Sequence, residues 1–337
     1  MDNQSESLAG VEMKVELTNI CRGGRCKFCS PMFRPIVVEA STDIFLDRFE
    51  EHLERYLSNG GRKVILTGGG EPTDAPAKLF GALRIIREVT QRLGIDLELL
   101  TMYTNAVNLL KPMGNDSGET YLDRLAELGL RDINLSVHGL TYEQKNGISG
   151  EEMANVDFDK LIPAIISKGF RVLTRTTLAT DYIESANQIK AFTLWAASLG
   201  VSIVYFSDLF QVPVRNKQTT PGSPTPLQWT DDHRIRFQEL LAAVGQDNDF
   251  VLVSESSRHN HQGRTLEFRH RESGVSVMFG DLVIGNESTE RSTYAYVKPD
   301  GSMGAHNNAR DTSTRAFVTP EQTRAYLQIY RPERDDL

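Results

Sequence analysis

The chain has 337 residues, 39% of them hydrophobic and 24% charged, and its 37 basic and 45 acidic side chains give a net charge of −8. This composition indicates a soluble protein with a sizeable core. Its acidic balance argues against a nucleic-acid partner, because phosphate binding needs a basic surface. No apolar run is long enough to cross a bilayer. The polar start carries no signal-peptide pattern, so we expect a cytoplasmic protein.

Strands and helices are predicted to alternate from residue 13 to residue 247. Short β-branched, apolar runs predict buried strands, and runs with apolar residues at helical spacing predict helices. Four of the helices end at a glycine directly before the next strand. The predicted strands are 13–19, 63–67, 97–103, 132–137, 171–178 and 201–206, and the helices are 43–58, 77–93, 120–128, 158–168, 185–199 and 231–244.

Such alternation implies parallel strands joined by right-handed crossovers. Six units predict an α/β fold, a partial (β/α)6 TIM-like barrel over residues 13–247, after a flexible N-terminus at 1–12. Residues 213–229 are rich in Pro, Thr and Ser and predict a loop. From residue 248 to 337 we expect a β-rich cap and tail, in which a C-terminal antiparallel β extension contains strands at 250–254, 265–269, 275–279 and 294–298.

The three cysteines of the chain lie together in the loop after the first predicted strand, as Cys21-Arg-Gly-Gly-Arg-Cys26-Lys-Phe-Cys29. An odd number at this spacing argues against disulfides. Three thiolates can bind three irons of a [4Fe-4S] cluster and leave the fourth iron without a protein ligand. S-adenosylmethionine (SAM) can chelate that open iron. Loops at the carboxyl ends of barrel strands build active sites, so we expect the cluster there.

Other interpretations of the cysteines remain open. A structural zinc site needs four ligands, and the nearest histidine, His52, lies within a predicted helix. A plant-type ferredoxin shares the spacing but needs a distant fourth cysteine. A buried structural trio fits poorly, because Arg22, Lys27 and two glycines make the loop polar.

A family resemblance becomes specific at the second strand. The segment Thr67-Gly-Gly69-Gly70-Glu71-Pro resembles the glycine–glycine–glutamate strand end of radical SAM enzymes. Glycines there allow a ligand to approach the backbone closely. The resemblance implies that the peptide groups of Gly69 and Gly70 and the side chain of Glu71 meet the amino group of SAM.

Further positions extend the resemblance over residues 13–210. It implies SAM contacts at the ends of the third and fourth strands and in the fifth, where an arginine would pair with the SAM carboxylate. Tyr205 and Phe206 are candidates to border the adenine, although such residues are more often core. The aromatic residue before the third cysteine is also typical of the family. The residues concerned are Phe28, Thr104, Asn105, Ser136 and Arg175.

The sequence departs from the family pattern in three places, one of which is Ala106, which stands where glycine is usual. The family spacing is C-x3-C-x2-C, whereas this chain has four residues between Cys21 and Cys26. Residues 294–303 resemble a segment that carries an auxiliary-cluster cysteine in members similar to cyclic pyranopterin synthase, but no cysteine follows here. We therefore expect one cluster and no auxiliary cluster.

Substrate residues are less well marked. Arg264 and Arg269 lie in a basic stretch that is either a grip on an anionic substrate or a solvated face. His138 lies beside the expected SAM site and is a candidate for proton transfer. The substrate is a small molecule or a peptide, and the resemblance implies a reductant such as flavodoxin or ferredoxin.

The leading hypothesis is therefore a radical SAM enzyme with a [4Fe-4S] cluster and SAM as cofactors. The cluster cleaves SAM reductively to a 5′-deoxyadenosyl radical, which abstracts a substrate hydrogen atom. One rival is a non-catalytic module that holds zinc or an iron–sulfur cluster. Another is an ordinary SAM methyltransferase or a phosphate-binding barrel, but neither explains three clustered cysteines.

Overall fold

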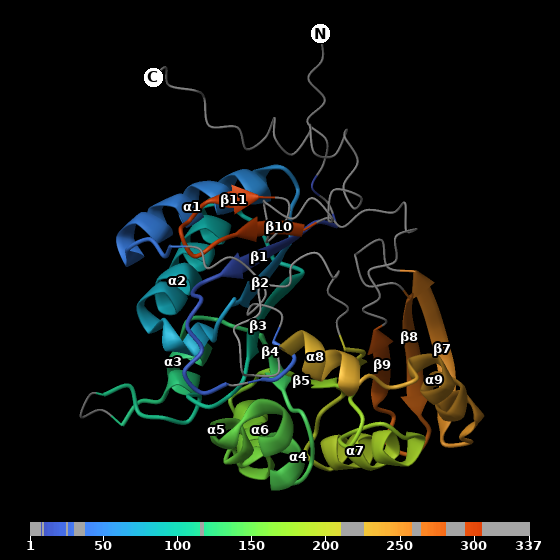
Figure 1. The fold of residues 1–337 in the computed structure, drawn as a ribbon. Coiled ribbons are helices and arrows are strands. Elements are labelled where there is room, and N and C mark those ends of the chain that lie inside the picture. Colours follow the sequence, from blue (N-terminus) through green and yellow to red (C-terminus); the bar gives the residue numbers. More distant parts are fainter. Residues whose placement is uncertain are drawn as a thin grey trace.

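The structure is a computed structural model. It describes residues 8, 10–24, 26–29, 38–114, 118–209, 226–257, 264–280 and 294–304. Within these residues the strands form one sheet in the order β11-β10-β1-β2-β3-β4-β5-β6-β9-β8-β7 (Figure 1). No helix of the described part is long and apolar enough to span a membrane.

Six parallel strands in sequence order form the centre of the sheet and confirm the partial barrel. Their bounds differ from the predicted ones by at most three residues, and those of β2 are identical. The strands are β1 (Glu12–Glu16), β2 (Lys63–Thr67), β3 (Leu99–Thr104), β4 (Asp132–Ser136), β5 (Arg171–Thr177) and β6 (Ile203–Ser207).

Helices between the strands cover the outer face of the sheet (Figure 1). Side chains alternate along each strand, so Met13, Leu66 and Ile133 are buried in the core beneath these helices. The helices are α1 (Thr42–Ser58), the 3-10 turn η2 (Pro72–Asp74), α2 (Pro76–Leu93), α3 (Tyr121–Glu127), α4 (Tyr142–Ser149), α5 (Glu151–Ala154), α6 (Phe158–Ser167), α7 (Ala186–Ser198), α8 (Pro226–Asp232) and α9 (Phe237–Gln246).

Three helical features differ from the prediction. Residues 231–244, expected as one helix, are parts of α8 and α9, and the segment between these helices contains neither glycine nor proline to mark the break. Helix α8 begins inside the expected loop 213–229. Helices α4 and α5 were missed, although Thr141 and Gln144 form a capping box at the start of α4.

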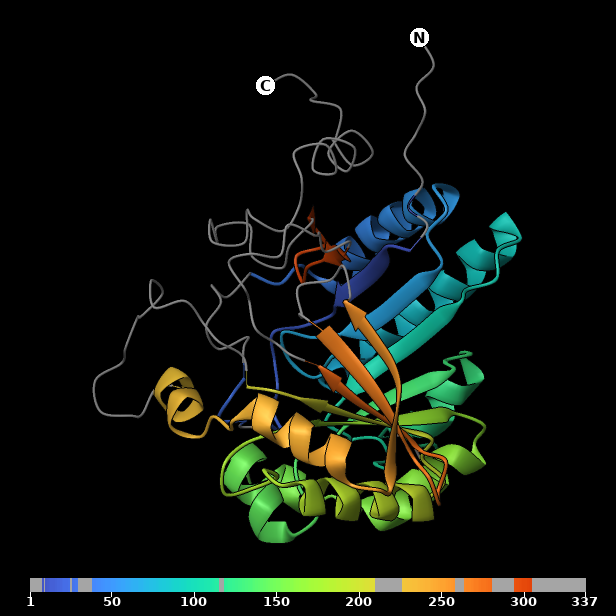
Figure 2. The same ribbon diagram turned by 90° about the vertical axis from the view of Figure 1, so that its right-hand side faces the viewer.

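The C-terminal strands join both edges of the barrel sheet. Strand β9 (Ser276–Gly280) pairs parallel with β6, and β8 (Arg264–His270) and β7 (Phe250–Ser257) follow antiparallel (Figure 2). Strand β10 (Tyr294–Val297) instead pairs parallel with β1, and β11 (Met303–Gly304) pairs antiparallel with β10. The antiparallel extension is therefore present, while the fourth expected strand lies at the opposite edge. The domain boundary at residue 247 stays a prediction.

Candidate functional site

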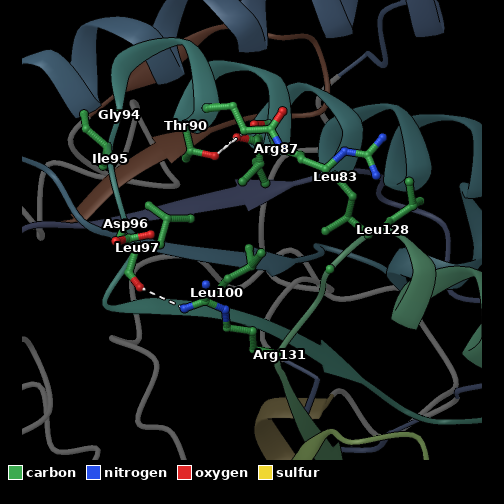
Figure 3. Close-up of a pocket in the computed structure, with 13 residues that line it drawn as sticks. Leu83, Arg87, Thr90, Gly94, Ile95, Asp96, Leu97, Leu100, Leu128 and Arg131 are labelled. Atoms are coloured by element: carbon green, nitrogen blue, oxygen red, sulfur yellow. Dashed lines mark hydrogen bonds between the residues drawn. The ribbon is translucent and has the colours of Figure 1, made fainter.

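A cavity of about 510 Å³ lies between α2 and the beginnings of β3 and β4, lined by Arg87, Asp96 and Arg131 (Figure 3). Arg131 donates a hydrogen bond to the carbonyl oxygen of Leu97 there. Parallel strands begin at one edge of the sheet and end at the other. This cavity is therefore at the edge opposite to the cysteine loop, which follows the end of β1.

The cysteine loop lies at the carboxyl edge of the sheet, as expected. The side chain of Cys21 is exposed, and those of Cys26 and Cys29 are half-buried. Burial and the neighbouring Glu71 carboxylate raise the pKa of the Cys21 thiol to about 11. Burial and neighbouring Cys29 raise the pKa of the Cys26 thiol to about 12. The thiols of Cys21 and Cys26 are thus protonated at neutral pH until a metal deprotonates them.

Helices α4 and α5, which the sequence analysis did not predict, pack against the cysteine loop. The backbone N–H of Lys27 donates to the carbonyl oxygen of Ile148, which lies in α4. The sulfur atoms of Cys26 and Met153 of α5 lie 4.0 Å apart. The ring of Phe28 lies 4.9 Å from that of His138 and 6.5 Å from that of Trp229 in α8. Phe28 thus anchors the loop between the fourth and sixth strand ends.

Glycines after β2 bring its end against the chain that leads into the cysteine loop. The N–H of Gly70 donates to the Thr18 carbonyl at 2.8 Å, and the N–H of Glu71 donates to the Ile20 carbonyl at 2.7 Å. A Cβ atom on Gly70 would lie 1.9 Å from the Ile20 carbonyl oxygen. Only glycine therefore allows this close approach.

The carboxylate of Glu71 joins the ends of β2 and β3. Its Oε1 accepts from the hydroxyls of Thr73 (2.8 Å) and Thr104 (2.7 Å), and its Oε2 accepts from the N–H of Asn105 at 2.7 Å. Burial raises the pKa of Glu71, although these hydrogen bonds lower it. These hydrogen bonds fix the two strand ends to each other. The expected contact of Glu71 with SAM stays a prediction.

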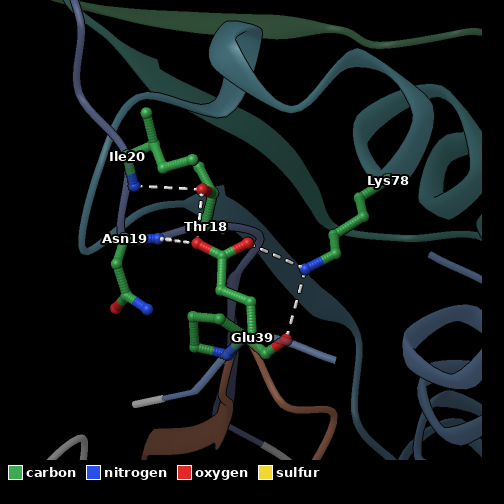
Figure 4. Close-up of polar contacts among 6 residues, drawn as sticks. Thr18, Asn19, Ile20, Glu39 and Lys78 are labelled. Carbon is green, nitrogen blue, oxygen red and sulfur yellow. Dashed lines mark hydrogen bonds and ion pairs between the residues drawn. The ribbon is translucent and has the colours of Figure 1, made fainter. Parts of the chain in front are cut away.

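A partly buried ion pair braces the base of the cysteine loop (Figure 4). Glu39 accepts from the Thr18 hydroxyl and the Asn19 N–H, both at 2.7 Å, and pairs with Nζ of Lys78 at 3.1 Å. The same Nζ donates to the Pro299 carbonyl at 3.3 Å. Chain segments on both sides of the cysteines are thereby tied to α2 and to the turn after β10.

Replacing Lys78 by methionine should lower the free energy of unfolding by about 2 kcal/mol, because it leaves the Glu39 carboxylate without its cation. The Lys78 side chain is only 6% exposed. Arg92→Met is the matched control on the same helix. Arg92 pairs with Glu50 and Glu54 but is 50% exposed, so its loss should cost less than about 1 kcal/mol. Urea unfolding measures both variants. Equal losses of unfolding free energy in Lys78→Met and Arg92→Met would contradict the stabilising role of the Glu39–Lys78 ion pair.

The inner face of the sheet carries the polar residues predicted to bind SAM. Ser136 lies opposite Arg175, which lies opposite Tyr205, in adjacent strands. The guanidinium carbon of Arg175 is 4.1 Å from the ring centre of Tyr205 and 5.2 Å from that of Tyr103, an arrangement typical of cation–π contacts. The structure therefore brings Ser136 and Arg175 together.

Oδ1 of Asn134 and the hydroxyl of Tyr205, both on this face, are buried polar atoms with no hydrogen-bond partner within the described part of the chain. Buried polar groups are normally hydrogen-bonded, so such atoms indicate a place for a ligand or water. Phe206, in contrast, points outward and packs against Phe192 and Phe279 in the core, so it does not border the lumen.

His138 is buried and neutral. Its Nδ1 accepts a hydrogen bond from the N–H of Thr177 at 3.2 Å, so the ring proton lies on Nε2. Burial and nearby Arg175 lower the pKa of His138 to about 3. At neutral pH His138 therefore cannot donate a proton as an imidazolium ion, and its part in proton transfer stays a prediction.

The titration of His138 should make stability pH-dependent. The pKa of His138 is about 3 in the folded protein and about 6.5 in the unfolded chain. The buried neutral ring therefore contributes its full stabilisation above pH 6.5, and this stabilisation is lost as the pH falls toward 3. Between pH 7 and pH 5 this group should cost about 2 kcal/mol of unfolding free energy. Urea unfolding of the wild type and His138→Gln at both pH values measures it. The same pH dependence in both proteins would rule it out.

The structure does not bring the predicted substrate arginine Arg269 to the site. Arg269 lies opposite Ser276 at the beginning of β9, whereas Gly280 ends β9 at the cysteine edge. Its side chain is exposed. The register of β8 against β9 decides where Arg269 lies, and the basic composition of this segment does not reveal that register. The side chain of Arg264 lies outside the described residues.

Comparison with known proteins gives a family match and a fold match. Residues 15–180 match the model of the radical SAM superfamily. The structure of Streptococcus suis SuiB bound to S-adenosylmethionine is similar, with a TM-score of 0.57 and 15% identity over 96% of this chain and 66% of that chain.

SuiB bound to the precursor peptide SuiA gives a TM-score of 0.53 and 15% identity, over 96% of this chain and 65% of that chain. The chain thus spans about two thirds of the length of SuiB. At this identity the likeness concerns the fold alone. A search of curated proteins finds no match.

Proposed function

The chain is a member of the radical SAM superfamily, and from this membership we propose that it cleaves SAM reductively with a [4Fe-4S] cluster held by Cys21, Cys26 and Cys29. The observation that carries the proposal is the position of all three thiols at the sheet edge where Gly70, Glu71 and Asn105 also meet. When bound, cluster and SAM supply a 5′-deoxyadenosyl radical that abstracts a hydrogen atom from the substrate.

The donor set fits such a cluster. The sequence has three cysteines and no fourth, so one iron remains open for SAM. Among the described residues, no three His, Cys, Asp or Glu side chains are grouped as ligands of a single ion. A cubane does not require this, because its three thiolates each bind a different iron.

The inner face of the sheet offers complementary groups for SAM. Arg175, held between Tyr103 and Tyr205, places a cation where a carboxylate can be paired. Oδ1 of Asn134 and the hydroxyl of Tyr205, which have no partner among the described residues, offer hydrogen bonds on the same face.

The substrate is proposed to be a peptide or an anionic small molecule. The fold likeness to SuiB, a protein solved with a precursor peptide, favours testing peptides first. A flavodoxin or ferredoxin would deliver the electron, and the cytoplasm would provide the reducing conditions that keep the thiols free.

The test is anaerobic reconstitution with iron and sulfide, followed by dithionite and SAM. We expect about four irons per chain, the number in a [4Fe-4S] cluster, and release of 5′-deoxyadenosine. A colourless protein with one zinc and no 5′-deoxyadenosine would overturn the proposal and favour the non-catalytic metal module.

A further inference from the structure

Asn105, directly after β3, has its side chain fixed between the backbone and the first cysteine. Its Oδ1 accepts the N–H of Val107 at 3.0 Å, which leaves Nδ2 as the free end of the amide. Nδ2 donates toward the sulfur of Cys21 at 3.6 Å. Because the amide oxygen is held on the other side, the donor and not the acceptor faces the sulfur.

The surrounding backbone keeps this arrangement in place. The N–H of Asn105 donates to Oε2 of Glu71, so the residue is held at three atoms. Ala106 has a φ of 70°, a left-handed conformation that L-residues adopt at a cost. Asn105 is only 8% exposed.

The cysteine loop leaves room for the contact between Asn105 and Cys21. A Cβ atom on Gly24 would lie 2.8 Å from the Cys21 sulfur and 3.5 Å from Nδ2 of Asn105, so glycine leaves room between the two. The backbone N–H of Gly24 also hydrogen-bonds the Cys21 thiol and lowers its pKa, against burial and Glu71, which raise it. The sulfur of Cys21 thus receives one backbone and one side-chain donor.

We propose that Asn105 is a positioning residue whose amide donates to the Cys21 sulfur and raises the reduction potential of the cluster bound there. Hydrogen bonds to the cysteine sulfurs of iron–sulfur clusters tune their potentials. A donor stabilises the more negative, reduced cluster more than the oxidised one. This inference rests on the proposed function, since it needs the cluster, but it concerns the potential and not the cleavage of SAM.

The test is a redox titration of the reconstituted full chain without SAM, followed by electron paramagnetic resonance. Asn105→Asp keeps an oxygen that can accept the Val107 N–H, and Asn105→Ala removes the amide altogether, so neither side chain has a donor for the sulfur. Each should lower the ratio of reduced to oxidised cluster at a fixed potential about tenfold, which is about 59 mV for a one-electron couple. The neutral alanine separates the loss of the donor from the added charge of aspartate.

Asn108→Ser is the control, because Nδ2 of Asn108 donates to Thr73 and Asp74 and not to sulfur. It should keep the wild-type potential. A wild-type potential in Asn105→Ala, with a full cluster, would overturn the role of Asn105 whatever the aspartate variant does. Failure of the wild type to assemble a cluster would instead overturn the proposed function.

Discussion

Cys26→Ala should leave a folded protein that assembles no [4Fe-4S] cluster and releases no 5′-deoxyadenosine. The sequence has three cysteines, so no other thiol can replace the lost one. Cys26 lies outside the hydrophobic core, and we expect its removal to change the free energy of unfolding by less than about 1 kcal/mol. Iron content, visible absorption and 5′-deoxyadenosine after reduction measure the effect.

Met153→Leu is the matched control for the same sulfur. Met153 contacts Cys26, is buried, and can be replaced by leucine with little change in volume. Such changes usually cost less than about 1.5 kcal/mol. We expect this variant to keep its cluster. An iron content in Cys26→Ala equal to that of the control would contradict the assignment of the three cysteines.

Gly70→Ala should have the second largest effect, through sterics at the base of the cysteine loop. Its Cβ would lie 1.9 Å from the Ile20 carbonyl oxygen, so the Glu71–Ile20 hydrogen bond must break or the loop must move. We expect a loss of about 3 kcal/mol in the free energy of unfolding and a weakened affinity for SAM. Urea unfolding and equilibrium binding of SAM to the reconstituted protein measure the two.

The adjacent Gly69→Ala separates this contact from a general intolerance of side chains. The nearest atoms to its Cβ would be Asn19 Oδ1 at 3.2 Å and the Thr18 carbonyl oxygen at 3.7 Å, and the first of these can shift with its side chain. We expect a loss below about 1 kcal/mol. Equal destabilisation by the two substitutions would show that the Gly70–Ile20 approach is not what requires glycine.

The local sequence was sufficient for the six barrel strands and for the cysteine trio, but not for helices α4 and α5 or for the division between α8 and α9. Short β-branched, apolar runs and helical spacings are properties of neighbouring residues, so they predicted β2 with its bounds and the six parallel strands of the barrel. Clustering of Cys21, Cys26 and Cys29 is likewise a local feature, and with Gly69 and Gly70 it indicated the radical SAM family that the family comparison confirmed.

Tertiary structure alone decided which residues meet. Asn105 and Cys21 are 84 residues apart in the chain, and their contact depends on the pairing of β1, β2 and β3. Strand register placed Arg269 at the far edge and turned Phe206 into the core. Long-range packing sets register and strand partners, and a short apolar segment such as β10 looks the same beside either edge strand. For this reason its pairing with β1 could not be read from the sequence.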